Sequence, residues 1–146
     1  MKNLLILTGL FLLSFTAYAV DPTYTAFLSD KAIRGYDTVA YFTENKPVKG
    51  AEEFSYEYKG AQWLFSSAEN LELFKAEPEK YAPQYGGYCA YAVSKGSTAP
   101  IKPELFTIHN DKLYLNFNSS VNDKWLSNID EYIQAADQNW PEIVDQ

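Results

Sequence analysis

Thiols, imidazoles and positive charges are all scarce in this sequence. Its 146 residues include one cysteine, Cys89, and one histidine, His109. A single cysteine cannot form an internal disulfide bond, and one Cys with one His cannot supply a closed four-ligand zinc site. Any catalytic triad that needs an imidazole would have to use His109. Only 12 Lys and Arg stand against 19 Asp and Glu, which argues against a nucleic-acid-binding protein.

Residues 1–19 are typical of a secretory signal peptide. Lys2 precedes an almost unbroken apolar run from Leu4 to Phe15, and residues 17–19, Ala-Tyr-Ala, form a small-x-small cleavage site. The run is shorter than the roughly 20 apolar residues of a membrane span, although an uncleaved N-terminal anchor is the alternative. Cleavage predicts a periplasmic or secreted protein without a membrane span. Losing Lys2 changes the formal charge from −7 to −8.

The rest of the chain predicts a small single α+β domain with two antiparallel β-hairpins and three or four short helices. We expect residues 20–30 to be a loosely held arm and residues 31–143 to form the domain. Hairpins are expected at 54–65 and 104–117, where apolar residues alternate around the turns Lys59-Gly60 and Asn110-Asp111. The expected helix signals are an N-cap at Asp37, a capping box from Ser66 to Glu69, and apolar spacing over 121–140 with a break near 128–130 and an end at Pro141.

Alternation assigns each hairpin an inner and an outer face. In the first hairpin, Phe54, Tyr56 and Tyr58 would face Phe65, Trp63 and Ala61, either as core or as an aromatic platform for a ligand. In the second, Phe106 and Ile108 would face inward with Leu115 and Leu113, which leaves Thr107, His109, Lys112, Tyr114 and Asn116 outside. An exposed His109 at a turn would be a poor catalytic base.

The segment from Tyr81 to Gly96 contains the remaining candidate functional side chains. Tyr81, Tyr85, Tyr88 and Tyr91 recur every three or four residues around Gly86-Gly87 and Cys89. In one interpretation the glycines make a bend and Cys89 is a small buried hydrophobe. In the other, a thiolate and phenols line a pocket for a soft metal ion or an aromatic ligand.

A resemblance to a known family extends over nearly all of the expected mature chain. The run from Tyr58 to Ser67 resembles the YHS domain, whose aromatic hairpin is followed by a short helix with Phe and by Pro-x-x-Tyr, here Asn70, Phe74, Pro78 and Tyr81. The longer stretch is similar to exported bacterial YHS-domain proteins, through the segments 32–37, 87–91 and 113–116. The resemblance implies a small α+β module, often associated with proteins that handle heavy metals.

This chain departs from the metal-binding members of the family. Phe65-Ser66-Ser67 holds no cysteine and position 70 is Asn, so their metal site cannot be carried over. Only Cys89, in the segment Gly87-Tyr88-Cys89-Ala90-Tyr91, remains as a thiol candidate.

Three functions compete on this basis. The first is a periplasmic, non-enzymatic module that binds a small ligand or a metal ion, such as copper or zinc, with Cys89 as the metal ligand. The second is a structural or protein-interaction module with an inert Cys89. The third is an enzyme with a Cys89 nucleophile, which would need a base within about 3 Å. The candidate ligand-binding residues are Cys89, Tyr85, Tyr88, Tyr91, Tyr36, Asp37 and Trp63. The sequence indicates neither the ligand nor the oligomeric state.

Overall fold

A computed structural model describes residues 19–144, so the expected leader, apart from Ala19, lies outside the described residues. The described chain is an α+β fold with two separate two-stranded antiparallel sheets, as predicted. It holds six α-helices rather than three or four, because α3 and α4 are too short to leave a periodic apolar pattern. The elements are η1 Ile33–Gly35, α1 Thr38–Thr43, β1 Ala51–Tyr58, β2 Ala61–Phe65, α2 Ala68–Ala76, α3 Pro78–Tyr81, η2 Gln84–Gly87, α4 Ala90–Ser94, β3 Phe106–His109, β4 Lys112–Leu115, α5 Ser119–Ser127 and α6 Ile129–Ile143.

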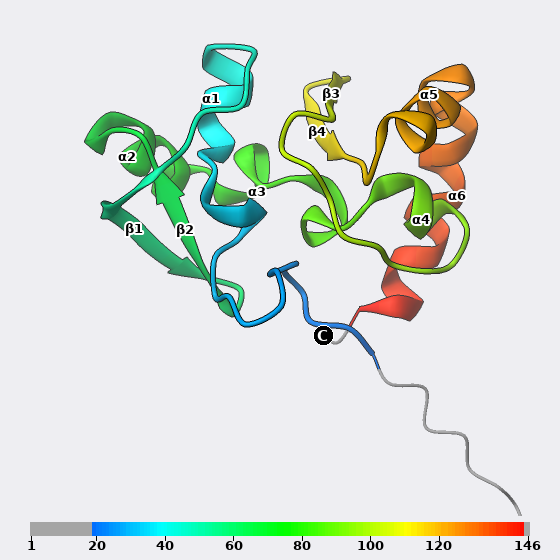
Figure 1. The fold of residues 1–146 in the computed structure, drawn as a ribbon, viewed down its shortest axis with the longest axis horizontal. Helices are drawn as coiled ribbons and strands as arrows, with labels where there is room; N and C mark the ends of the chain where they lie inside the picture. Colours follow the sequence, from blue (N-terminus) through cyan, green and yellow to red (C-terminus); the bar gives the residue numbers. More distant parts are fainter. Residues whose placement is uncertain (1–18, 145–146) are drawn as a thin grey trace, which may run out of the picture.

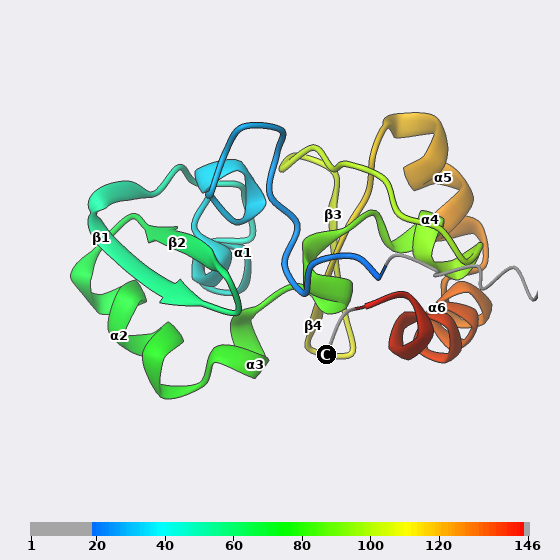
Figure 2. The same cartoon turned by 90° about the horizontal axis from the view of Figure 1, so that it is seen from below.

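The elements gather into two lobes. Figures 1 and 2 show β1, β2, α1 and α2 on one side, the hairpin lobe, and α4, α5 and α6 on the other, the helical lobe. The hairpin β3–β4 and helix α3 lie between them. Each side has its own hydrophobic cluster: one contains Phe65 and Phe74, and the other contains Trp125 and Ala136.

The first hairpin keeps the predicted turn but not the whole predicted register. Tyr58 pairs with Ala61 and Tyr56 with Trp63, as expected. Farther from the turn the register shifts, so Phe65 pairs with Ala51 and the predicted pairing of Phe54 with Phe65 is wrong. A bulge of this kind lets β1 bend while its side chains still reach the core.

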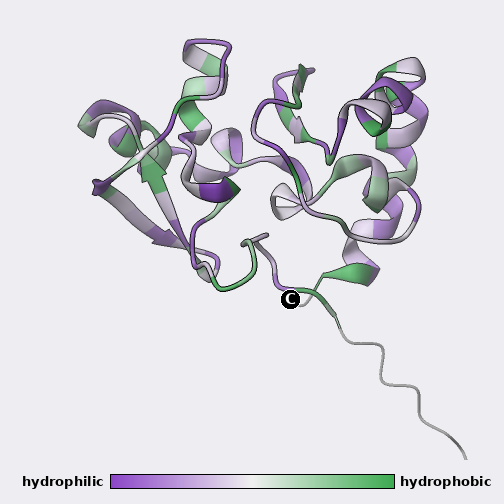
Figure 3. Ribbon diagram, in the orientation of Figure 1, coloured by the Kyte–Doolittle hydropathy of each residue, from purple (hydrophilic) through white to green (hydrophobic). Residues whose placement is uncertain are grey.

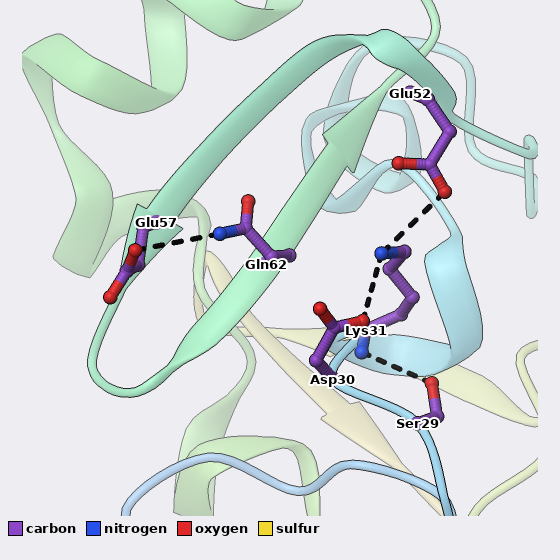
Figure 4. Close-up of polar contacts among 6 residues, drawn as sticks. All are labelled: Ser29, Asp30, Lys31, Glu52, Glu57 and Gln62. Carbon is purple, nitrogen blue, oxygen red and sulfur yellow. Dashed lines mark hydrogen bonds and ion pairs between the residues drawn. The ribbon is translucent and has the colours of Figure 1, made fainter.

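Residues 29–32 lie beside the first hairpin and are attached to it by backbone hydrogen bonds. The amide of Ala32 donates to the Gln62 carbonyl, 2.9 Å away, and the Gln62 amide donates to the Asp30 carbonyl at 2.8 Å. Figure 4 shows Lys31 reaching from this segment to the carboxylates of Asp30, at 2.8 Å, and Glu52, at 3.5 Å. These ion pairs are exposed, so the backbone bonds contribute most of the attachment.

The second hairpin is shared by both hydrophobic clusters. Phe106 pairs with Leu115 and Ile108 with Leu113, as predicted. The prediction that Tyr114 and Asn116 lie on an exposed face is wrong, because their side chains are 2% and 0% exposed. Helix α5 covers that face: the Tyr114 ring packs against Trp125, and Asn116 donates to Asn122 at 3.2 Å.

Helix boundaries follow the cap chemistry with two corrections. Asn118 caps α5 by accepting from the Val121 amide, and the chain breaks at Asn128 as expected. The N-cap of α2 is Ser67 rather than Ser66, because the Ser66 hydroxyl donates to Asp37 instead. Helix α6 continues through Pro141 to Ile143, since a proline near a helix end disturbs little of the ladder behind it.

Part of the expected arm is fixed rather than loose. Thr23 and Tyr24 are buried. The Tyr24 amide donates to the Gly86 carbonyl at 2.9 Å, and the Thr23 hydroxyl donates to the Lys59 carbonyl at 2.9 Å. The segment thus crosses between the two lobes, where Figure 1 draws it in blue. Across residues 19–144, no helix combines the length and apolarity needed to span a bilayer.

Candidate functional site

Cys89 lies at the junction of the two hydrophobic clusters. It precedes α4, forms an isolated bridge with Leu115 at the end of β4, and is 1% exposed. The polar partner of its Sγ is Asn116 Oδ1, 3.5 Å away. Burial raises the pKa of the Cys89 thiol, against the opposing effect of hydrogen bonds from the backbone of Ala92, Phe117 and Tyr91. The thiol is therefore neutral and shielded, as in the interpretation of Cys89 as a small buried hydrophobe.

The surroundings of Cys89 do not fit a transition-metal site. Copper and zinc sites combine several thiolate, imidazole or carboxylate ligands, whereas the side-chain group bonded to Sγ is the amide of Asn116. Within residues 19–144, no three His, Cys, Asp or Glu side chains come together as a possible metal-binding group. The role of Cys89 as a metal ligand thus stays a prediction without a ligand set to support it.

His109 is far from Cys89 and already has a partner. It pairs with Lys112 at the turn end of the second hairpin, whereas Cys89 bridges Leu115 at the other end of the same strand, roughly 10 Å away by strand geometry. The His109 Nε2 lies 2.8 Å from the exposed Asp130 carboxylate. Among the described residues no base contacts the Cys89 sulfur, so the geometry does not support a thiol nucleophile.

Asp37 is a structural carboxyl group. It is fully buried and accepts five hydrogen bonds: from the amides of Val39 and Ala40, from the amide and hydroxyl of Ser66, and from the side-chain amide of Asn70. These bonds cap α1 and tie it to the end of β2 and to α2. The carboxyl oxygens are therefore used within the fold.

The other predicted site residues do not converge on Cys89. Tyr36 belongs to the edge of the hairpin-lobe cluster. Tyr88 packs between Tyr24 and Trp140. The Tyr91 ring lies against Tyr132 of α6. Only Tyr85 and Trp63 come together, at a groove that the sequence analysis did not predict.

The groove lies along the junction of the two lobes and has a volume of about 760 Å³. Its walls come from the hairpin lobe, through Trp63 and the turn at Tyr58–Lys59, and from the helical lobe, through the end of α6. The chain from α3 to Gly86 and the buried arm at Pro22–Thr23 complete it. A volume of this size is within the range of small-molecule sites.

Tyr85 occupies an unusual position in the groove wall. Its backbone has φ +57°, in the left-handed region that non-glycine residues seldom adopt. Its hydroxyl donates to Asp137 Oδ1 at 2.8 Å. Burial, and next the bond to Asp137, raise the pKa of this phenol, so it stays protonated and keeps donating. Backbone strain held by its surroundings is a feature of ligand sites.

Gly86, which follows Tyr85, allows the groove wall to pack closely against the arm. Gly86 has φ +61°, and a Cβ there would lie 2.0 Å from the Pro22 carbonyl oxygen. Only a residue without a side chain allows the arm to close this side of the groove. The Gly86-Gly87 pair was the one local signal in the sequence for this close approach.

Sequence reasoning missed the groove residues on α6 and at the hairpin turns. Asp137, Trp140, Lys59 and Lys112 line the groove but come from widely separated segments. Trp140 was expected only as the last residue of the apolar spacing over 121–140, and Lys112 on an outer face. No local pattern distinguishes a residue that lines a groove from one that covers a core.

Comparison with known proteins identifies one part of the chain. Residues 39–85 match the family model of the YHS domain. The match runs from α1 to Tyr85 and so ends at the groove, before Cys89. No curated protein and no solved structure matches the chain.

Proposed function

Because residues 39–85 form a YHS domain, we propose that the protein is an exported, non-enzymatic module in which this domain and the helical lobe together bind a small ligand. The groove carries the proposal: about 760 Å³ in volume, it is lined by Trp63 and Tyr85 of the domain and by Trp140 of α6. Aromatic walls with a few polar groups are typical of small-molecule sites.

Binding of a flat uncharged probe tests this proposal. Indole is titrated into the isotope-labelled protein while amide shifts are followed by NMR. We expect saturable shifts concentrated at Lys59, Gly86 and Lys112, and weaker binding in Trp140→Ala. Phe27→Ala is the matched control, because Phe27 is 93% exposed and lies outside the groove. Shifts that do not saturate, or that follow Phe27 rather than Trp140, would contradict the proposal, provided thermal unfolding shows that both variants fold.

An interaction module is the second candidate, and the loop at residues 26–29 favours it. Phe27 and Leu28 are 93% and 91% exposed, and the loop is drawn in hydrophobic colour in Figure 3. Adjacent exposed apolar side chains often mark a contact surface. Sedimentation velocity of the wild type and of Phe27→Ser/Leu28→Ser tests self-association through this loop. A concentration-dependent dimer lost in the double variant would favour it, and a monomer in both would remove it.

Export has its own test. When the full chain is expressed in a bacterial host, we expect the periplasmic fraction to contain protein that begins at Val20, since cleavage is expected after Ala19. Intact-mass analysis of that fraction checks the cleavage point. Ala19→Arg should block processing, and Ala26→Arg is the control outside the cleavage site. Unprocessed wild type would support an uncleaved anchor instead.

A further inference from the structure

Exposed charges of both signs border the groove. Lys59 and Lys112 line it together with Glu79 and Asp137. All four side chains are exposed, and within residues 19–144 none of them forms an ion pair. Of the eight described lysines outside the groove, four pair with a carboxylate and four do not. Asp137 accepts the hydrogen bond from Tyr85 at one oxygen, Oδ1.

The four charges reach the groove from four different elements. Lys59 is in the turn of the first hairpin and Lys112 is the first residue of β4, while Glu79 is on α3 and Asp137 on α6. The tertiary fold therefore sets two positive and two negative groups around one cavity without letting them meet. Aromatic surface lies among them, because Tyr58 and Trp140 line the same groove.

We propose that the groove binds a small aromatic zwitterion, a molecule that carries a planar ring, an ammonium group and a carboxylate. This inference rests on the proposed function and adds the chemical class of the ligand. The lysines recognise the carboxylate, Glu79 and Asp137 recognise the ammonium, and the ring lies against the aromatic walls. A ligand of one charge would satisfy one pair and face the other with like charge, which complementary sites use to reject wrong partners.

Four related probes separate the three parts of this recognition. Phenylalanine has ring and both charges, 3-phenylpropanoate lacks the ammonium, 2-phenylethylamine lacks the carboxylate, and leucine lacks the aromatic ring. Affinity is measured by calorimetry on the mature protein. A hydrogen bond to a charged group corresponds to roughly tenfold in affinity or more. Phenylalanine should therefore bind at least about tenfold more tightly than either singly charged probe, and more tightly than leucine.

Charge-removing variants link the selectivity to the groove. Lys112→Gln should weaken phenylalanine and 3-phenylpropanoate but not 2-phenylethylamine, and Glu79→Gln should weaken phenylalanine and 2-phenylethylamine but not 3-phenylpropanoate. Lys124→Gln and Glu53→Gln are matched controls, because both residues are exposed and lie outside the groove.

Each result decides between this inference and the function on which it rests. Equal or tighter binding of a singly charged probe overturns the zwitterion and leaves the small-ligand function standing. Selectivity that Lys112→Gln and Glu79→Gln do not change overturns the assignment to these residues. Failure of all four probes while indole still binds at the groove also overturns the zwitterion alone. Failure of indole as well overturns the proposed function with it.

Discussion

Asp37 shows how one buried side chain can hold three elements together. Its two oxygens accept five hydrogen bonds, from the start of α1, from the end of β2 and from α2. Oδ2 alone receives the amide of Ser66, the Ser66 hydroxyl and the Asn70 amide at 2.7–2.8 Å. A group that can only accept is therefore needed here, and Asn is a poor replacement despite its shape.

Asp37→Asn should be strongly destabilising. The NH₂ group of the new Asn would replace an accepting oxygen, so some buried donors that now bond to Asp37 would lose their partner. This should lower the free energy of unfolding by about 3 kcal/mol or more. Asp111→Asn is the matched control, since Asp111 is exposed at a turn with φ +58° that Asn tolerates well. Urea unfolding of both variants makes the measurement. Similar stabilities would show that the Asp37 network contributes little.

Cys89 should be unreactive in the folded protein. Its side chain is 1% exposed and burial raises its pKa, so both access and thiolate are limited. We expect alkylation by iodoacetamide to be at least roughly a hundredfold slower in the folded than in the denaturant-unfolded protein, because it requires local opening. Mass spectrometry gives both rates. Equal rates would return Cys89 to the list of reactive thiols.

At the scale of elements, two glycine variants can separate how much the contact between the arm and η2 stabilises the fold from how much the glycine backbone conformation does. Gly86 and Gly96 both have positive φ, +61° and +79°, but a Cβ meets the Pro22 carbonyl only at Gly86 and nothing within 4 Å at Gly96. Gly96→Ala should cost roughly 1 kcal/mol from backbone conformation. Gly86→Ala should cost roughly 1–3 kcal/mol more, because the arm must move.

Limited proteolysis gives that comparison a second measurement. In Gly86→Ala we expect faster cleavage within residues 20–30, while Gly96→Ala should leave the arm as protected as in the wild type. If both variants lose the same stability and keep the same protection, the close contact between Gly86 and Pro22 is not what fixes the arm.

Local sequence patterns predicted those elements whose signals lie within a few residues. The turns at Lys59-Gly60 and Asn110-Asp111, the Asp37 cap and the break at Asn128 depend on neighbouring residues alone. The burial of Tyr114 and Asn116 depends on a helix that arrives later in the chain, and the hydroxyl of Ser66 was diverted by Asp37, 29 residues away. The groove forms only when five segments that are far apart in the sequence come together. Local patterns could therefore mark Tyr85 and Trp63 as candidate site residues but could not predict the groove.

For the whole molecule, buried tyrosines should make the free energy of unfolding decrease at alkaline pH. Burial raises the pKa of Tyr114 to about 12, and burial likewise raises the pKa values of Tyr41 and Tyr85 above the ordinary value of about 10. The folded protein thus holds these protons more tightly than the unfolded chain. Their contribution to stability is complete below pH 10 or so and is lost as the pH rises toward the folded-state values.

We therefore expect the free energy of unfolding to fall steeply between about pH 10 and 12. Urea unfolding at a series of pH values measures the slope, and tyrosinate absorbance reports whether the phenols ionise only when the protein unfolds. The free energy of unfolding of Tyr114→Phe should fall less steeply than that of the wild type. Identical slopes for the wild type and Tyr114→Phe would exclude Tyr114 as a source.

The bridge between Val20 and Val144 has a topological consequence. The Val20 amide donates to the Ile143 carbonyl at 2.9 Å, which brings the two ends of the folded region side by side. A short linker from residue 144 to residue 20 would close the chain into a ring with little strain, and a cut at the exposed loop of residues 95–97 would open it elsewhere. Such a circular permutant would split the polypeptide between α4 and β3 and keep every segment that builds the groove.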